Sequence, residues 1–253
     1  MPVHDLFFSV ARITTADPES ESTGFFYRHN AGDVYLVTNR HCVIDEDDDF
    51  KPTEISVLVH KSGVELWDVE NETISLYDSN GLPIWLEHSD GTHVDVVLIP
   101  CQFLFEKQYV IKALQEHNFL PPNIPLSPGE DLVVIGFPLG FFDAINNLPV
   151  VRNAALASAH NIAFNQNPHF LVDARLHSGS SGSPVWTKPR DQLCTTDGAV
   201  RMGTAGPGGY YFFTGVFSAA YDPPRDKIED EPLGLNKVWF ARLLPEIIAG
   251  TNQ

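Results

Sequence analysis

Short apolar runs of strand length, separated by turn residues, recur along almost the whole chain. In TEISVLVH, the apolar residues Ile55, Val57 and Val59 alternate with others, which is the period of a half-buried β-strand. Similar runs are GFFYRH, DVYLVT, HVDVVLIP, EDLVVIGFP, HFLVDARL, SPVWT and YYFFTGVFSAAY. About a dozen short strands at regular turn spacing predict an all-β fold made of barrels or a sandwich.

Two segments have helical rather than strand signals. In FEKQYVIKALQEHNF, residues 105–119, Val110 and Leu114 lie four positions apart, which predicts one helix. The stretch NKVWFARLLPEIIAG predicts an amphipathic C-terminal helix over residues 236–249, capped by Asn236 and ended by Gly250. The proline-rich stretch PPNIPLSPGE predicts a crossover between two halves of the chain over residues 118–130.

Length and charge restrict the class of protein. The 253 residues, 43% hydrophobic and 19% charged, are enough for one large domain or two small ones. The net charge of -17 argues against a nucleic-acid partner, because neutralising phosphates requires clustered Lys and Arg. No window reaches the roughly 18 apolar residues of a membrane span. The N-terminus lacks the basic start and long apolar core of a secretory signal, so we expect no membrane partner.

Cysteine usage indicates a reducing compartment. Cys42, Cys101 and Cys194 are few, odd in number and widely spaced, which argues against a disulfide framework and favours a cytoplasmic location. We expect no metal and no cofactor, because no pair of cysteines has zinc-finger spacing and no other ligand cluster is present. The acidic run DEDDDF, residues 45–50, lacks the glycine and glutamate spacing of a calcium loop and predicts a solvated loop.

Three polar residues, each beside an apolar strand, suggest nucleophilic catalysis. LVTNRHCV places His41 at the end of one strand, and HVDVVLIP places Asp95 at the start of another. HSGSSGSPVW, residues 177–186, contains serines among glycines that let the backbone turn sharply and direct its N–H groups at a ligand. Serine hydrolysis needs a nucleophile, an imidazole base and an orienting carboxylate. The order His, Asp, Ser excludes the α/β-hydrolases, which run Ser, Asp, His.

The segments TGFFYRHNAGDVYLVTNRHCV, HVDVVLIP, LVVIGFPLG and DARLHSGSSGSPVW together resemble the trypsin-like serine peptidase family, closest to its bacterial HtrA-like branch. The resemblance implies two six-stranded antiparallel β-barrels with the active site in the cleft between them. The chain would then be a single peptidase domain, with the first barrel over residues 1–117 and the second over 131–235. The C-terminal helix would follow, leaving no room for the peptide-binding PDZ domain that HtrA proteins append.

The family motif G-x-S-G-[GS]-P aligns with the stretch GSSGSP that begins at Gly179. The alignment implies that Ser181 is the nucleophile and His41 the general base. Asp95 would accept a hydrogen bond from the imidazole and hold its tautomer. The backbone N–H groups of Gly179 and Ser181 would form the oxyanion hole. No cofactor is implied.

The resemblance also implies where a substrate binds, because TGVFSAAY is similar to the strand that pairs with the substrate backbone. The implied substrate-binding residues are Arg175, Leu176, His177, Ser218, Ala219 and Ala220. Leu176 and the alanines suit an aliphatic side chain, whereas Arg175 or His177 would suit an acidic one. Alternatively, Arg175 forms an ion pair elsewhere on the surface. No aspartate stands at the pocket floor, which argues against cleavage after Lys or Arg.

Two departures from the family pattern matter. Ser180 precedes the nucleophile where zymogen-forming members carry an aspartate that pairs with a newly cut N-terminus. We therefore expect no activation by N-terminal cleavage. Cys42 follows the catalytic His as in secreted members, but the partner position is not Cys, so we expect a free, buried thiol.

The function implied is a serine endopeptidase of bacterial type that acts on protein or peptide substrates. Three alternatives stay open. One is a catalytically idle trypsin-like fold that serves as a binding or sensor module, although such a fold would be free to lose the triad. The second is a hydrolase of esters or other acyl groups. The third is a protease that is active only with a regulatory protein partner.

Overall fold

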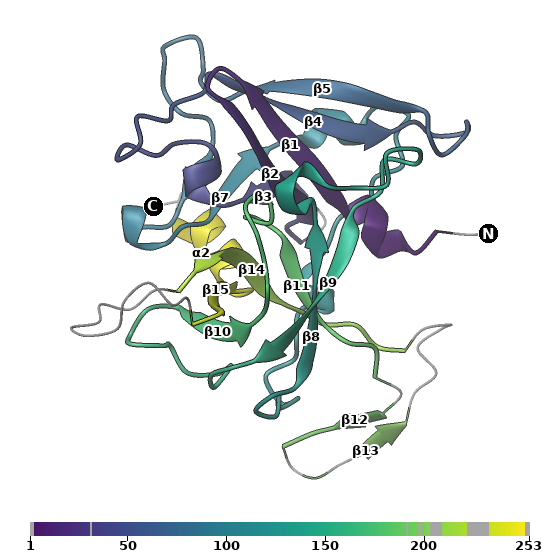
Figure 1. Cartoon of the computed structure of the whole chain (residues 1–253), viewed down its shortest axis with the longest axis vertical. Helices are drawn as coiled ribbons and strands as arrows, with labels where there is room; N and C mark the ends of the chain where they lie inside the picture. Colours follow the sequence, from purple (N-terminus) through teal and green to yellow (C-terminus); the bar gives the residue numbers. More distant parts are fainter. Residues whose placement is uncertain are drawn as a thin grey trace.

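The computed structural model describes residues 3–30, 32–190, 192–196, 198, 200–202, 209–221 and 233–250. Their strands form two main antiparallel β-structures, one from each half of the chain (Figure 1). Two α-helices are also present among them, α1 (Gln102–Phe105) and α2 (Leu243–Gly250). Neither of these helices is long and apolar enough to cross a membrane.

The first half of the chain forms a seven-stranded sheet in the order β5-β4-β1-β2-β3-β7-β6. Its strands are β1 (Val10–Ala16), β2 (Glu19–Arg28), β3 (Val34–Thr38), β4 (Glu54–His60), β5 (Val69–Ser75), β6 (Leu86–Glu87) and β7 (Val97–Pro100). Ile55, Val57 and Val59 of β4 are buried on one face, as their alternation predicts.

The described residues do not form the predicted first barrel as a closed six-stranded ladder. The sheet has seven strands, and its two edges, β5 and β6, are not hydrogen-bonded to each other. β6 has two residues, Leu86 and Glu87, and both pair with β7. Beside the two edges, the N–H of Ile84 donates to the carbonyl of Leu76 at 3.0 Å, so single backbone contacts replace a continuous ladder there.

The second half contains a closed six-stranded barrel in the order β10-β15-β14-β11-β8-β9, which confirms one of the two predicted barrels. Its strands are β8 (Asp131–Gly136), β9 (Val150–Leu156), β10 (His169–Asp173), β11 (Pro184–Thr187), β14 (Phe213–Ala220) and β15 (Leu235–Phe240). A separate hairpin pairs β12 (Gln192–Cys194) with β13 (Val200–Met202). Residues 119–130 connect the two halves and contain no helix or strand.

The C-terminal helix exists, but it starts later than predicted. Asn236 is not its cap: residues 235–240 form β15, and α2 begins at Leu243. Asn236, Val238 and Phe240 stand at every second position of β15 and are all buried. The Asn236 side-chain amide donates to the carbonyl of Ala174 at 2.7 Å. The barrel therefore extends beyond residue 235, because closing it requires the apolar face of this strand.

The predicted helix over residues 105–119 is also wrong. Only Phe105 belongs to α1, and the 3₁₀-helix η4 covers Glu116–Asn118. Between them the backbone donates to other segments: the N–H of Val110 to His60, and the N–H of Leu114 to Phe26, at 2.9 and 2.8 Å. An extended chain satisfies these donors and also buries alternate side chains against the first sheet.

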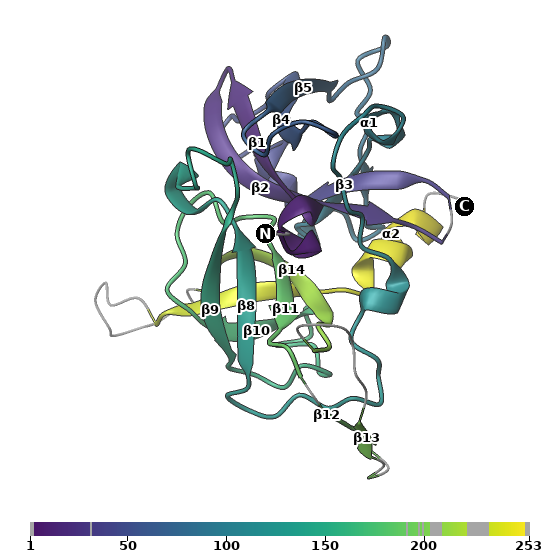
Figure 2. The ribbon, with the colours of Figure 1, turned by 90° about the vertical axis from the view of Figure 1, so that its right-hand side faces the viewer.

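Apolar residues form a core in each half and a third one between them. The core between the halves joins Phe25 and Leu98 of the first sheet to Trp186 and Val216 of the barrel. Leu244 of α2 lies in the same core, so the end of the chain packs against the first sheet (Figure 2). This shared core holds the two halves at a fixed position relative to each other, so residues from both halves can meet in one site.

Candidate active site

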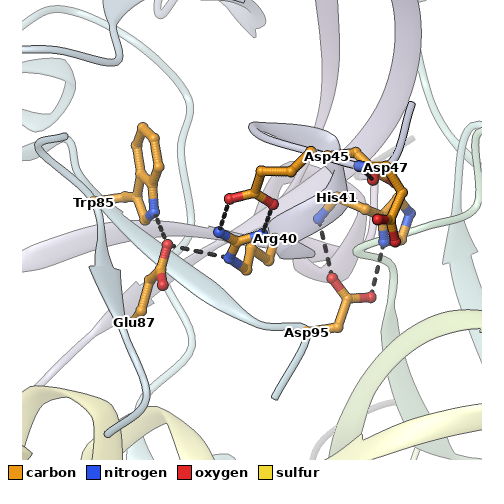
Figure 3. Close-up of polar contacts among 8 residues, drawn as sticks. Arg40, His41, Asp45, Asp47, Trp85, Glu87 and Asp95 are labelled. Atoms are coloured by element: carbon orange, nitrogen blue, oxygen red, sulfur yellow. Dashed lines mark hydrogen bonds and ion pairs between the residues drawn. The ribbon is translucent and has the colours of Figure 1, made fainter. Parts of the chain in front are cut away.

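The histidine and the aspartate meet because their strands are neighbours. His41 lies in the 3₁₀-helix η2 (Arg40–Cys42), directly after β3, and Asp95 lies two residues before β7. Strands β3 and β7 pair with Thr38 opposite Val97. The Nδ1 atom of His41 is 2.8 Å from Oδ2 of Asp95, and the backbone N–H of His41 donates to Oδ1 at 3.0 Å (Figure 3). Both carboxylate oxygens therefore orient the histidine.

Arg40 anchors η2 from the side away from Asp95. Its guanidinium donates two hydrogen bonds to Glu46, both of 2.8 Å, and lies 3.3 Å from the carboxylate of Glu87. Trp85 donates to the same Glu87 carboxylate (Figure 3). The acidic run at residues 45–50 is exposed over residues 46–49, as predicted, but Glu46 has the additional role of holding the helix that carries His41.

Sequence reasoning missed Asn39. This residue is fully buried, and its side-chain amide donates to the backbone carbonyl of Asp95 at 2.7 Å. It therefore fixes the main chain of the residue that orients His41. The only signal in the sequence was a short polar residue at the end of an apolar strand, and that signal is common in turns.

Ser181 comes from the other half of the chain, in the turn between β10 and β11, and its side chain is partly exposed. Ser218 of β14 connects it to the first half. The Ser218 hydroxyl donates to Oδ2 of Asp95 at 2.6 Å, and the Ser218 carbonyl accepts from the Ser181 hydroxyl at 3.1 Å. In this arrangement the Ser181 hydroxyl is thus directed at a backbone carbonyl, and it must rotate to bond with His41.

The turn before Ser181 needs glycine at position 179. Gly179 has a φ of +83°, and a Cβ atom there would be 2.5 Å from the carbonyl oxygen of Phe137. The N–H of Leu139 donates to the carbonyl of Ser178 at 2.6 Å. Because the peptide is planar and trans, this bond also sets the opposite direction of the Gly179 N–H. Among the described residues, the N–H groups of Gly179 and Ser181 donate to no backbone oxygen.

Thr23 of β2 joins the first sheet to this turn, and sequence reasoning did not identify it. Its backbone N–H donates to the carbonyl of Ser181 at 2.9 Å. Its hydroxyl donates to the carbonyl of Gly179 at 2.7 Å and accepts from the N–H of Phe137 at 3.0 Å. A single buried residue therefore positions the backbone on both sides of Ser180.

The electrostatics of the pair favour a charged histidine and a charged aspartate. Burial alone lowers the pKa of His41, but Cys42 and the hydrogen bond and charge of Asp95 more than offset it, so this pKa is raised. Burial alone raises the pKa of Asp95, but His41 and the Ser218 hydroxyl outweigh it, so this pKa is lowered. Asp95 can therefore stabilise an imidazolium, which is the state that follows proton transfer from a nucleophile.

The residues predicted to bind substrate lie on two segments that meet at the start of β15. Ala220 pairs with Asn236, whose amide also bonds to Ala174, next to Arg175. The Arg175 side chain is exposed, Leu176 packs partly against the barrel core, and His177 is half-buried, while Ala219 and Ala220 are exposed. The two segments predicted to form the walls of the substrate pocket thus lie on either side of Asn236.

Two further observations concern cysteines and metals. Cys42 is free and buried, as predicted, and Cys101 is also free and buried. Burial raises the pKa of Cys101 to about 12, so this thiol stays protonated. In the described ranges, no group of three or more His, Cys, Asp or Glu side chains is placed to hold a metal ion.

Comparison with protein-family models matches residues 22–194, more than half of the chain, to the trypsin-like peptidase domain. The chain belongs to the trypsin-like peptidase family. The matched range includes His41, Asp95 and Ser181. A comparison with curated protein sequences gives no match.

Solved structures that resemble this trypsin-like peptidase domain include two proteases. One is the Rv3671c protease of M. tuberculosis in an inactive form, with 17% identity, a TM-score of 0.50, and coverage of 98% of this chain and 91% of that chain. The other is the HtrA-type protease AlgW, solved with a tripeptide, with 14% identity and a TM-score of 0.52. That match covers 96% of this chain and 60% of AlgW. At these identities the likeness concerns the fold.

Proposed function

We propose that this trypsin-like peptidase is a serine endopeptidase that hydrolyses peptide bonds through His41, Asp95 and Ser181. The observation that supports the proposal most directly is the continuous set of hydrogen bonds from His41 through Asp95 and Ser218 to Ser181. These four residues come from four separate parts of the chain, and a merely structural histidine or serine would not need this convergence.

The proposed mechanism follows from the chemistry of each group. The Ser181 hydroxyl rotates away from the Ser218 carbonyl and attacks the carbonyl carbon of the substrate, while Nε2 of His41 accepts its proton. Asp95 holds the opposite nitrogen, Nδ1, and stabilises the imidazolium. The N–H groups of Gly179 and Ser181 bind the oxyanion. The imidazolium then protonates the leaving amine, and water hydrolyses the acyl-enzyme by the same steps in reverse order.

We further propose that the intact chain needs no N-terminal cleavage to become active. Ser180 is buried and uncharged, so it cannot form the ion pair on which zymogen activation depends. The test is to assay uncut protein before and after limited proteolysis. Equal activity supports the proposal, and activity that appears only after nicking contradicts it. The free cysteines Cys42 and Cys101 support the additional proposal of a reducing, cytoplasmic location in a bacterium.

A second candidate is a protease that becomes active only with a regulatory protein partner. The orientation of the Ser181 hydroxyl favours it, because the hydrogen bond to the Ser218 carbonyl must be broken before the hydroxyl can reach His41. In a preassembled protease, by contrast, substrate binding alone turns this hydroxyl toward His41.

A fluorophosphonate probe distinguishes them, with the adduct located by mass spectrometry. We expect labelling of the wild type at Ser181, none of Ser181→Ala, and unchanged labelling of Ser178→Ala, an exposed serine in the same turn. Removing the nucleophile should lower turnover on the order of 10⁶-fold. If folded wild-type protein is not labelled, the preassembled protease is excluded. An activated ester and a peptide of equal length then separate esterase from peptidase activity.

A further inference from the structure

A cavity of about 580 Å³ lies at the junction between the crossover segment and the second barrel. Residues 119–128, the end of β9, the start of β14 and the connection between β15 and α2 contribute its walls. None of His41, Asp95, Ser181 and Ser218 lines it. Its volume lies within the range of small-molecule binding sites, so it is large enough for a ligand of its own.

The walls of the cavity are mainly apolar and are held rigidly. Phe119, Leu156, Phe213 and Phe240 line it, and the rings of Phe119 and Phe213 are 5.4 Å apart. The crossover segment adds several prolines, whose fixed φ angles reduce the number of conformations this wall can adopt. A preformed apolar cavity of this kind binds a hydrocarbon group without a large ordering cost.

Among the described residues that line the cavity, Arg242 carries a permanent charge and none is Asp or Glu. The Arg242 guanidinium lies over the ring of Phe240 at 4.1 Å, and its Nε is 3.6 Å from a carboxylate oxygen of Glu246. A guanidinium has five donors in a fork, so Glu246 leaves others for a second carboxylate.

His160 lines the cavity beside Arg242 without adding a charge. The ring of His160 packs against the rings of Phe170 and Phe240 at 4.8 and 5.9 Å. Burial lowers the pKa of His160, and the hydrogen bond with the backbone of Thr214 offsets this only in part. The ring is therefore neutral, and it serves as part of the apolar wall next to the guanidinium.

We propose that this cavity binds a small amphiphilic carboxylate. The hydrocarbon part lies between Phe119, Phe213 and Leu156, and the carboxylate bonds to the guanidinium of Arg242. This inference is independent of the proposed peptidase activity, because none of the proposed catalytic residues lines the cavity.

The test is isothermal titration of the full chain with octanoate, and with octan-1-ol and octyltrimethylammonium as ligands of equal chain length. We expect octanoate to bind at one site and more tightly than the alcohol or the cation. Arg242→Gln should weaken octanoate about tenfold or more, as expected for the loss of a charge-assisted hydrogen bond, and should leave the alcohol unaffected. Arg28→Gln is the matched control, because Arg28 also lies over an aromatic ring, that of Phe105 at 5.1 Å, but does not line the cavity.

NMR of the histidine ring protons locates the ligand. We expect octanoate to shift the His160 signals and to leave those of His60, which lies in β4, unchanged. Octanoate affinity that is equal in wild type and Arg242→Gln, equal binding of the carboxylate and the cation, or binding that does not shift His160 would each overturn the proposal. Fluorophosphonate labelling of the same variants keeps this test separate from that of the catalytic site.

Discussion

Replacing Thr23 with valine removes one buried hydroxyl and leaves two backbone groups without a partner. The hydroxyl donates to the carbonyl of Gly179 and accepts from the N–H of Phe137, and the residue is fully buried. Valine has nearly the same shape but can form neither bond. A buried polar group that loses its partner costs about 1–3 kcal/mol, so Thr23→Val should lower the free energy of unfolding by roughly 2–6 kcal/mol.

Thr23→Ser is the matched control, because it keeps the hydroxyl and loses only a methyl group, which costs on the order of 1 kcal/mol. Urea denaturation followed by tryptophan fluorescence gives both free energies of unfolding. We also expect Thr23→Val to lower kcat for a peptide substrate, since the carbonyl of Gly179 loses the bond that fixes the turn before Ser181. Equal destabilisation by valine and serine would show that the hydroxyl does not bridge the two halves.

Three further predictions follow from the same structure. The raised pKa of His41 means that the imidazole loses its proton only above its usual pH range, so kcat/KM should rise with pH well beyond pH 6.5. Asp95→Asn should move this rise in the pH profile to lower pH and reduce kcat about 10⁴-fold, as in other triads. A pH profile that Asp95→Asn does not move would contradict the assignment. Gly182→Ala places a Cβ against the backbone of β2, whereas Gly129→Ala, also at positive φ, places its Cβ with no atom within 4 Å. Thermal melting should show a loss of stability of about 1–2 kcal/mol for Gly129→Ala and a clearly larger loss for Gly182→Ala. Similar losses for the two variants would refute the clash. Burial lowers the pKa of His169 to about 4, with a smaller contribution from Lys237, so between pH 6.5 and 4 the unfolded chain binds a proton that the folded chain does not. The free energy of unfolding should therefore fall by about 3 kcal/mol as the pH falls through this range. Urea denaturation at each pH measures this loss, and His169→Phe should remove it.

The incorrect helix over residues 105–119 and the misplaced start of the C-terminal helix have one physical cause. Residues 105–119 contain both a spacing of four, Val110 to Leu114, and a spacing of two, Tyr109 to Ile111. The sequence does not decide between the two periods. The decision comes from the backbone partners that the first sheet offers at His60 and Phe26. Asn236 is a comparable case, because a residue suited to cap a helix is used inside the barrel to bond Ala174.

The candidate catalytic residues were proposed from local signatures and from the family resemblance: His41 and Asp95 stand at strand ends, and the family motif selects Ser181 in a glycine-rich turn. The residues that position them were not. Thr23 bonds to Gly179 across 156 positions of sequence, and Asn39 bonds to Asp95 across 56. A buried threonine in a strand has no local feature that announces such a partner.

The sequence by itself therefore determined the strand-rich class, because alternation and turn chemistry act over a few neighbouring residues. The barrels and the residues proposed for catalysis came from the resemblance to the trypsin-like peptidase family. Only the tertiary structure decided that no continuous ladder closes the first sheet, that Ser218 connects Ser181 to Asp95, and that a cavity forms beside Arg242. Each of these depends on the distance between segments far apart in the chain. Such distances are set by the packing of the whole core.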